Sequence, residues 1–430
     1  MLLKFATLLF VATSLALGQT TSPVAVSTDR DCSQDLSNLW LDVVVVVDNS
    51  VGMTQNGLVE VAAQIVTVFG EGTRIGTKYA DKRSTRVGLV TYNKDATVQA
   101  DLNRFQSSDD LFNTVFQILP TPSTSDEVYL AKGIGAAEKV LADGRKNNTR
   151  TNYKQFVIVY ASDYKDDGDQ DPRPIANRLK ASGVTIATVA FDQQGDESIL
   201  KQLGEIATPG FNFTNKDKDN QLGEIATPGF NFTNKDKDNV GEIQNAMIQA
   251  NCFCSNLWIQ YREKFEDEFS SKYGVCLKSV ALASSWTPAK FACQNMIQQG
   301  YMVTEFNQKK HDFVFKLVQN DTAFPEPYVY HIGLSYVNGG YYWQQPVNQP
   351  LKPLTDGIWN PGFPQTTSSN TAVINQQDGT AFTTTSSNTA VINQQDGTAF
   401  TVGWQNINQY TVSERYLCEV AACDTANYCA

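Results

Sequence analysis

The sequence predicts an α/β domain built on a doubly wound parallel sheet, followed by an α+β domain stapled by disulfides. The 430-residue chain is longer than one hydrophobic core usually fills, so two domains are expected. Its cysteines divide it in the same way, because none lies between Cys32 and Cys252 and seven lie from Cys252 onward. We expect an N-terminal segment at 19–37 and domains at 38–250 and 254–430.

Residues 1–18 have the pattern of a secretory signal peptide. Lys4 precedes an apolar run from Phe5 to Leu17, and Ala16-Leu17-Gly18 supplies small residues for cleavage. The run is shorter than the roughly 20 residues that span a bilayer. We therefore expect a secreted, extracellular protein without a membrane span. The formal charge of −11 argues against nucleic acid as a partner, because phosphate binding needs clustered cations.

The strands of the first domain begin with Leu41–Asp48, a continuous β-branched run typical of a strand buried on both faces. Three more segments have strand patterns: Val87–Tyr92, Phe156–Ser162 and Val184–Phe191. Helical patterns alternate with them: Leu58–Phe69, Leu130–Leu141 and Pro174–Ala181. This alternation predicts parallel βαβ units, in which ligands bind at the carboxyl ends of the strands. Asp48 and Asp163 would lie at that edge.

Three segments give this domain a resemblance to a known family. Asp48-Asn49-Ser50-Val51-Gly52 resembles the D-x-S-x-S loop of von Willebrand factor A domains. Val157–Asp163 resembles the strand with that family's second metal-site aspartate, and Ala131–Ile134 resembles the helix start that follows its metal-site threonine. The resemblance implies an adhesion site that holds Mg²⁺ or a similar ion in a cage of oxygens.

The metal site implied by this resemblance is degenerate. Asp48, Ser50 and Asp163 match the family's ligands. Gly52 and Val128 stand where the second serine and the threonine belong, and neither offers a side-chain oxygen. No cofactor is therefore certain, and a weakly bound Mg²⁺ or Ca²⁺ ion is the one that the sequence suggests.

Two interpretations of this loop stay open. In the first, water and the nearby Asp126 and Glu127 compensate for the missing hydroxyls. In the second, Asp48 and Ser50 only accept hydrogen bonds from loop amides where the strand turns into a helix. The neighbouring acidic residues are better explained as a solvated loop than as a chelating site. These residues are Asp166, Asp167, Asp169 and Asp171.

From about Cys254 the chain becomes rich in aromatic residues, with helical patterns at Ser285–Gln299 and Asn307–Val318 among short strands and turns. Six landmarks in chain order resemble a C-type lectin-like domain of the long form. They are Gly274–Leu277, Trp286–Cys293, His331–Leu334, Trp343, Trp359 and Tyr416–Glu419. The resemblance implies a disulfide-stapled α+β fold and a role in recognition.

The same resemblance implies two of the disulfides. It pairs Cys293 with Cys418 and Cys254 with Cys276. Cys32 and Cys252 bracket the first domain, so we propose that they pair, which leaves Cys423 with Cys429. Eight cysteines permit 105 pairings, so this map is a hypothesis.

Calcium-dependent members of the lectin-like family use a Glu-Pro-Asn or Gln-Pro-Asp loop and a Trp-Asn-Asp strand. Here the loop has Phe363, Pro364 and Gln365, and the strand has Trp404 and Asn406. These five residues are the candidate ligand-binding residues. They contain no carboxylate, and Ca²⁺ takes about 6–8 oxygens, so we expect recognition largely independent of calcium.

Aromatic residues near this loop have two interpretations. Tyr341, Tyr342 and Trp343 either stack on a sugar or peptide or pack in the core.

The only two histidines, His311 and His331, lie outside any catalytic motif, so we expect no enzyme activity. His331 occupies a strand-core position and is expected to be buried. His311 lies between charged residues of a helix and is expected to face solvent.

Four Asn-x-Thr sequons are glycosylation candidates: Asn147, Asn212, Asn231 and Asn320. Two segments are also duplicated without change, 202–220 as 221–239 and 366–383 as 384–401. One copy suits each domain, so we expect the extra copies to form long loops. A recent duplication or a gene-model error explains the identity better than function does.

The leading functional hypothesis is a secreted, non-enzymatic recognition or adhesion protein that binds glycans or glycoproteins, including those of microbial surfaces. A similarity to secreted nematode lectin-like proteins implies a role in innate immunity. The alternative is an extracellular matrix or scaffold protein that binds protein partners through the first domain.

Overall fold

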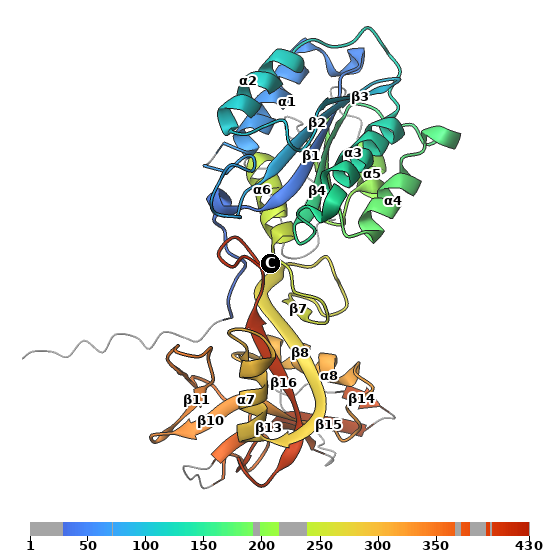
Figure 1. Ribbon diagram of the computed structural model, residues 1–430. Coiled ribbons are helices and arrows are strands. Elements are labelled where there is room, and N and C mark those ends of the chain that lie inside the picture. The colour runs from blue at the N-terminus through green and yellow to red at the C-terminus, as the bar shows by residue number, and fades with distance from the viewer. Residues whose placement is uncertain are drawn as a thin grey trace, which may run out of the picture.

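The protein consists of two domains arranged end to end (Figure 1). The computed structural model describes residues 29–70, 72–191, 198–214, 239–365, 371–378, 393–395 and 398–429. The expected signal peptide at 1–18 and the sequon at Asn231 lie outside the described residues. Within the described ranges, no helix is both long enough and apolar enough to cross a membrane.

The first domain is built on a six-stranded sheet of order β3-β2-β1-β4-β5-β6. All neighbours are parallel except β2 and β3, which form an antiparallel pair. The strands are β1 (Leu41–Asp48), β2 (Arg86–Tyr92), β3 (Ala96–Ala100), β4 (Lys154–Ala161), β5 (Thr185–Ala190) and β6 (Asn212–Thr214). Every residue of β1 is buried, because helices cover both faces of a doubly wound sheet.

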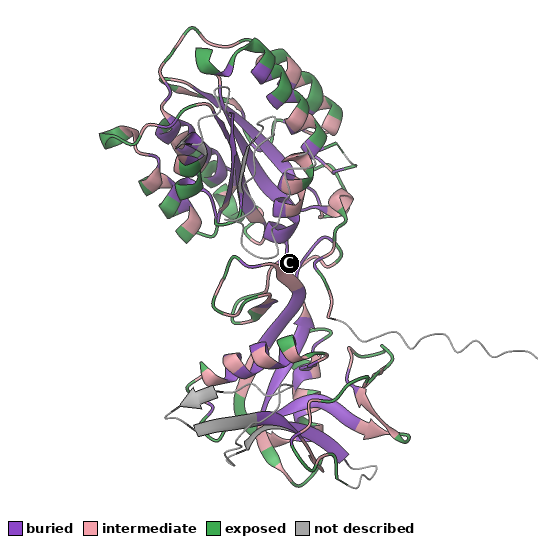
Figure 2. Cartoon of the chain, turned by 180° about the vertical axis from the view of Figure 1, so that it is seen from behind, coloured by how far each residue is buried: buried purple, intermediate pink, exposed green. Residues whose placement is uncertain are grey.

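Six helices cover this sheet: α1 (Gln55–Val68), α2 (Ser108–Ile118), α3 (Leu130–Gly144), α4 (Arg173–Ala181), α5 (Ser198–Ile206) and α6 (Asn239–Asn251). α1, α2 and α6 pack on one face, and α3, α4 and α5 pack on the other (Figure 1). Figure 2 shows the resulting buried sheet between two helical layers whose outer faces are exposed. The doubly wound α/β architecture predicted from the sequence is therefore confirmed.

The second domain contains a larger sheet of order β14-β15-β13-β10-β16-β8-β7, with β9, β11 and β12 attached beside it. Its strands are β7 (Ile259–Arg262), β8 (Lys272–Ser285), β9 (Tyr301–Met302), β10 (Val329–Val337), β11 (Gly340–Trp343), β12 (Lys352–Pro353), β13 (Thr371–Asp378), β14 (Asn393–Gln395), β15 (Thr398–Asn408) and β16 (Ser413–Ala421). Two helices, α7 (Trp286–Met296) and α8 (Gln308–Gln319), pack against it.

The described cysteines form four disulfides: Cys32–Cys252, Cys254–Cys276, Cys293–Cys418 and Cys423–Cys429. These are the four pairs expected from the sequence. Cys293–Cys418 ties α7 to β16, whereas the other three lie around the junction between the domains.

The junction is buried and aromatic. The Trp40 ring lies 5.3 Å from that of Tyr153, 5.3 Å from that of Phe253 and 4.9 Å from that of Tyr428. Its indole Nε1 donates to the Asp424 carbonyl over 2.8 Å. The junction thus joins β1 of the first domain to the C-terminal loop of the second.

Helix α8 contradicts one prediction. His311 is fully buried rather than solvent-facing. Its neighbour Lys310 is also fully buried, and the Lys310 Nζ lies 2.5 Å from Asp29 Oδ1 and 2.9 Å from Glu419 Oε2. Asp29 and Glu419 enclose Lys310, whereas Glu305 and Trp404 lie against His311, so segments far away in the sequence cover both residues.

In the second domain both copies of the duplicated segment contribute strands: β13 comes from the first copy, and β14 and the start of β15 come from the second. In the first domain, the end of α5 and β6 come from the first copy. β13 pairs directly with β15, from Thr371–Asn408 to Asp378–Thr401. Residues 215–238 and 379–392, which hold most of the second copies and the predicted loops, lie outside the described residues.

Candidate functional site

Two regions contain the residues predicted to bind metal or ligand. The first is the carboxyl edge of the parallel sheet, at the end of the first domain away from the second domain (Figure 1). Asp48 ends β1, and Asp163 follows β4 after Ser162. The topology therefore brings these residues to the same edge, as predicted.

The Asp48 carboxylate is engaged with the protein itself. Its Oδ1 accepts from the backbone N–H of Ser50 over 2.8 Å. Its Oδ2 accepts from the backbone N–H of Ser162 over 3.1 Å and from the Ser162 hydroxyl over 2.5 Å. Burial raises the pKa of Asp48, while the hydrogen bonds from Ser162 and Ser50 oppose that shift. These contacts are those of the loop-amide interpretation, extended by a serine that the sequence analysis missed.

The residues at this edge do not reproduce the oxygen cage of the implied metal site. Gly52 and the buried Val128 provide no side-chain oxygen. A Cβ added at Gly52 would lie 3.1 Å from Ser162 Oγ, so Ser162 occupies space beside the missing side chain. Asp163 is exposed and its Oδ1 accepts from the Tyr164 amide over 2.8 Å. Across the described ranges, no three His, Cys, Asp or Glu side chains are grouped so as to hold a metal ion.

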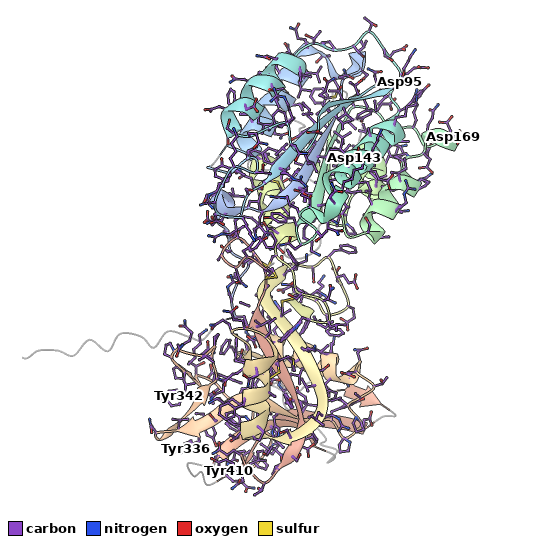
Figure 3. All side chains as sticks on the ribbon, in the orientation of Figure 1. Asp95, Asp143, Asp169, Tyr336, Tyr342 and Tyr410 are labelled. Carbon is purple, nitrogen blue, oxygen red and sulfur yellow. A yellow bond between two sulfur atoms is a disulfide. The ribbon has the colours of Figure 1, made fainter. Side chains whose placement is uncertain are left out.

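Acidic residues surround this edge. Asp166, Asp167 and Asp169 are exposed, as expected of a solvated loop. Asp171 instead accepts from Arg173 Nε over 2.9 Å. Figure 3 shows Asp95 and Asp169 at this outer part of the first domain, far from Tyr336, Tyr342 and Tyr410 of the second.

The second region is the loop Phe363–Gln365 beside β15. The Gln365 amide donates to Asn406 Oδ1 over 2.8 Å, and Asn406 Nδ2 donates to the Gln365 carbonyl over 3.3 Å. This pair of bonds, here called the amide clamp, holds the loop against the strand. Pro364 and Gln365 are exposed and Phe363 is half-buried, so the loop presents its side chains at the surface.

Trp404 differs from the other ligand candidates because it is fully buried. Its indole Nε1 donates to Glu305 Oε2 over 2.7 Å, and its ring lies 5.3 Å from Trp343 and 5.7 Å from Trp359. A ligand cannot reach a side chain enclosed in this way. The prediction that Trp404 contacts a ligand is therefore wrong, and Trp404 instead anchors β15 in the core.

The sequence analysis missed Glu305, which centres a buried polar cluster beneath β15. Besides Trp404, it contacts His311 Nδ1 at 2.7 Å through Oε2 and accepts from the Tyr330 hydroxyl at 3.2 Å through Oε1. Burial alone lowers the pKa of His311, but the charge and hydrogen bond of Glu305 outweigh it and raise that pKa above its usual value. No pattern in the sequence around Glu305 indicated that its carboxylate would be the shared partner of this buried cluster.

The aromatic residues near the loop divide between core and surface. Trp343 is buried, whereas Tyr341 and Tyr342 are half-buried. The Tyr341 ring lies 5.0 Å from the Trp359 ring. Packing therefore accounts for Trp343, whereas Tyr342 stays partly available at the surface.

Two of the sequon asparagines, Asn147 and Asn320, are exposed. Asn212 lies in β6, and its side chain is not among the described ones.

The chain matches the von Willebrand factor type A domain family over residues 42–228. It is 27% identical over 419 residues to C-type lectin domain-containing protein 160 of Caenorhabditis elegans, which covers 95% of this chain. The match spans 57% of that relative's length.

Solved structures with a similar arrangement include proximal thread matrix protein 1 from the mussel byssus, at 16% identity and a TM-score of 0.37, with 51% of this chain and 49% of that chain covered. Another is the vWF domain of the pilus tip protein Mfa5 from Porphyromonas gingivalis, at 14% identity and a TM-score of 0.35, with 49% and 97% covered. Residues 42–228, which hold the sheet of the first domain, therefore match the von Willebrand factor type A domain family, and nearly the whole chain is similar to a relative named as a C-type lectin domain-containing protein.

Proposed function

We propose that this protein is a secreted, non-enzymatic recognition protein that binds glycans or glycoproteins through the loop Phe363–Gln365 of its second domain, without calcium. The amide clamp is the observation that carries this proposal. It closes the loop onto β15 with protein hydrogen bonds, at the place where the resemblance to C-type lectin-like domains implies a calcium ion. The name of the Caenorhabditis elegans relative supports a lectin-like role.

The proposed location rests on the disulfides. All eight cysteines are paired, and such pairs persist in oxidising compartments outside the cytosol. Glycans of microbial surfaces are the first ligand class to test, because the resemblance implies a defensive role.

The test is binding of the purified full-length protein to a glycan array in Ca²⁺ and Mg²⁺ and again in EDTA. We expect the same glycans to bind in both buffers. Phe363→Ala should weaken the signal about tenfold, a loss of about 1.4 kcal/mol. Phe291→Ala removes a ring that is 54% exposed on α7 and should leave the signal unchanged. Loss of binding in EDTA, or absence of glycan binding in both buffers, would contradict the proposal.

A second candidate function, binding of matrix or scaffold proteins through the first domain, is favoured by one observation. Val51 lies at the Asp48 edge and is 51% exposed. A protein partner that binds this edge would cover Val51 together with the exposed Asp163.

The two functions are distinguished by one pair of variants. Val51→Asp should abolish capture of extracellular matrix proteins but not glycan binding. Val98→Asp changes another exposed valine of the same domain, on β3, and serves as its control. Equal capture by both variants would exclude the Asp48 edge as the binding surface.

A further inference from the structure

Lys310 of α8 is a buried lysine that lies between two buried carboxylates. Its side chain is 0% exposed, and the side chains of Asp29 and Glu419 are 3% and 1% exposed. The Lys310 Nζ lies 2.5 Å from Asp29 Oδ1 and 2.9 Å from Glu419 Oε2. The Asp29 carboxyl carbon is one bond from Oδ1, so it lies within about 4 Å of Nζ. An amine nitrogen, a carboxyl carbon and a second carboxylate therefore meet at one place.

The groups around the Lys310 Nζ form an enclosed site. The Tyr261 and Phe306 rings have their centres 5.6 Å and 5.4 Å from Nζ. Nζ also donates to the buried Thr304 hydroxyl over 2.9 Å. Asp29, Glu419 and Thr304 thus provide one acceptor for each of the three N–H donors of the ammonium group. The ammonium group is bound by protein groups in place of water.

Glu419, on β16, is held in a fixed orientation beside Lys310. Its Oε1 accepts from the Tyr301 hydroxyl over 2.6 Å. Its Oε2 accepts from the Thr304 backbone N–H over 2.8 Å and from the Thr304 hydroxyl over 2.9 Å. Oε2 is also the oxygen that faces the Lys310 Nζ, within the distance over which a carboxylate can accept a proton. Glu419 is therefore placed to take a proton from Lys310 and to return it nearby.

Protons in this cluster are exchanged between its own members. Burial raises the pKa of Asp29; Lys310 opposes this shift and the charge of Glu419 adds to it. Burial lowers the pKa of Lys310, but the charges of Asp29 and Glu419 outweigh burial and hold that pKa above its usual value. A proton that leaves Lys310 thus passes to a neighbouring carboxylate. The transfer converts a buried ion pair into an amine beside a carboxylic acid.

We propose that Lys310 and Asp29 become joined by a side-chain amide bond in the folded protein, with Glu419 as the acid–base group. The Lys310 ammonium first gives one proton to the Asp29 carboxylate. The neutral Nζ then attacks Asp29 Cγ, and Glu419 accepts a second proton from the nitrogen as the N–C bond forms. Glu419 returns that proton to the Asp29 hydroxyl, the C–O bond breaks and one water molecule leaves. Glu419 ends as the carboxylate it was, and no co-reactant is consumed.

The arrangement accounts for a reaction without an activated carboxyl group. Two groups held in contact react as if at effective concentrations of about 10⁵–10⁸ M. The amide also replaces two buried charges by a neutral group, which removes the desolvation cost of the ion pair. The bond would tie the segment just before Cys32 to α8. It involves no residue of the loop Phe363–Gln365 and does not depend on glycan binding.

The test is mass spectrometry of tryptic peptides from the purified full-length protein, after its disulfides have been reduced and alkylated. Trypsin cleaves after Arg30 but does not cleave after an amide-linked Lys310. We therefore expect the peptide that ends at Arg30 to be joined to the peptide that contains Lys310, with a combined mass that is lower by one water molecule. Tandem fragmentation should locate the bond at Asp29 and Lys310. Two separate peptides, with cleavage after Lys310, would overturn the proposal.

Variants of the three residues test their roles. Asp29→Ala and Lys310→Arg should abolish the bond, because each lacks one reacting group. Acid–base catalysis contributes about 10²–10⁴-fold to rates, so Glu419→Gln should leave the two peptides separate over the time in which wild type becomes joined. Joining at the wild-type rate in Glu419→Gln would overturn the role of Glu419.

The matched controls change exposed neighbours of the reacting residues. Asp31→Ala removes an exposed carboxylate of the same segment, and Lys309→Arg changes the exposed lysine before Lys310. Both should keep the bond, and loss of the bond in both controls would contradict the assignment to Asp29 and Lys310. Circular dichroism identifies any variant that fails to fold, and the wild-type peptides decide the proposal in that case as well.

Discussion

Both histidines are buried, yet their pKa values shift in opposite directions. His331 Nε2 lies 2.8 Å from the Ser284 carbonyl, so this nitrogen carries the proton. Burial lowers the pKa of His331 to about 4, because no carboxylate compensates for desolvation of the charged ring. His311 is buried as deeply, but Glu305 supplies that charge. The carboxylate of Glu305 therefore accounts for the opposite directions of the two pKa shifts.

His331 predicts a pH dependence of stability. Below pH 6.5 the unfolded chain binds a proton at this position that the folded protein binds only near pH 4. The free energy of unfolding should therefore fall by about 3 kcal/mol as the pH drops from 6.5 to 4. Chemical denaturation of wild type and His331→Gln over this range isolates the effect, because the variant lacks it. Parallel curves for the two proteins would refute the assignment.

Glu305 predicts a large loss of stability on truncation. Glu305→Ala leaves the indole of Trp404, the His311 ring and the Tyr330 hydroxyl without their shared acceptor. We expect a cost of about 3–5 kcal/mol, measured by chemical denaturation. Glu266→Ala removes a carboxylate that is 70% exposed in its pair with Lys316 and should cost less than about 1 kcal/mol. Similar costs for both would show that the buried cluster contributes no more than a surface pair.

At the scale of elements, strands were easier to predict than helix surfaces. The apolar, β-branched segments that form β1, β2, β4 and β5 are typical of strands buried on both faces, so these strands were predicted. α2 (Ser108–Ile118) was missed although Ser107 caps its start and its buried Leu111 and Val115 are four residues apart, as on one face of a helix. Lys310 of α8 is paired with Asp29, more than 270 residues earlier in the chain, and no local pattern reveals that contact. The sequence placed Asp48 and Asp163 at the correct edge of the sheet. It did not predict that Ser162 would bind the Asp48 carboxylate.

The amide clamp makes a prediction for the loop beside β15. Asn406→Ala removes both hydrogen bonds to Gln365, so the Gln365 amide should exchange its hydrogen at least about tenfold faster, while the core of β10 and β16 stays protected. Hydrogen exchange measured by mass spectrometry or NMR tests this. Gln405→Ala, on the same strand, is the control. Unchanged exchange in Asn406→Ala would show that the clamp does not hold the loop.

At the scale of the whole molecule, the junction couples the domains through several kinds of contact. Asn152 Nδ2 donates to the Tyr428 hydroxyl over 3.0 Å and to the Cys429 carbonyl over 2.7 Å. Arg30 forms an ion pair with Asp424 at 2.7 Å, and Cys32–Cys252 adds a covalent bond. Relative domain motion is the usual expectation for two domains, but these contacts oppose it.

Substitution of Tyr428 should weaken the contact between the two domains. Its ring packs 4.9 Å from Trp40 and 5.9 Å from Tyr153 of the first domain, so Tyr428→Ala removes two contacts across the junction. Small-angle X-ray scattering should show a larger maximum dimension and greater flexibility. Tyr410→Ala, which removes a tyrosine that is 58% exposed on the second domain, should scatter like wild type. Identical curves for all three proteins would show that Tyr428 does not restrain the domains.

The Cys32–Cys252 bond also determines how a pulling force would pass through the molecule. It joins two positions 220 residues apart, and Asp29 and Arg30, just before it, are held by Lys310 and Asp424 of the second domain. A pull that enters through this short segment crosses directly to the second domain by way of the disulfide. The disulfide therefore carries the force past the first domain. That domain should stay folded under a force that would unfold it if the chain through it had to carry the load.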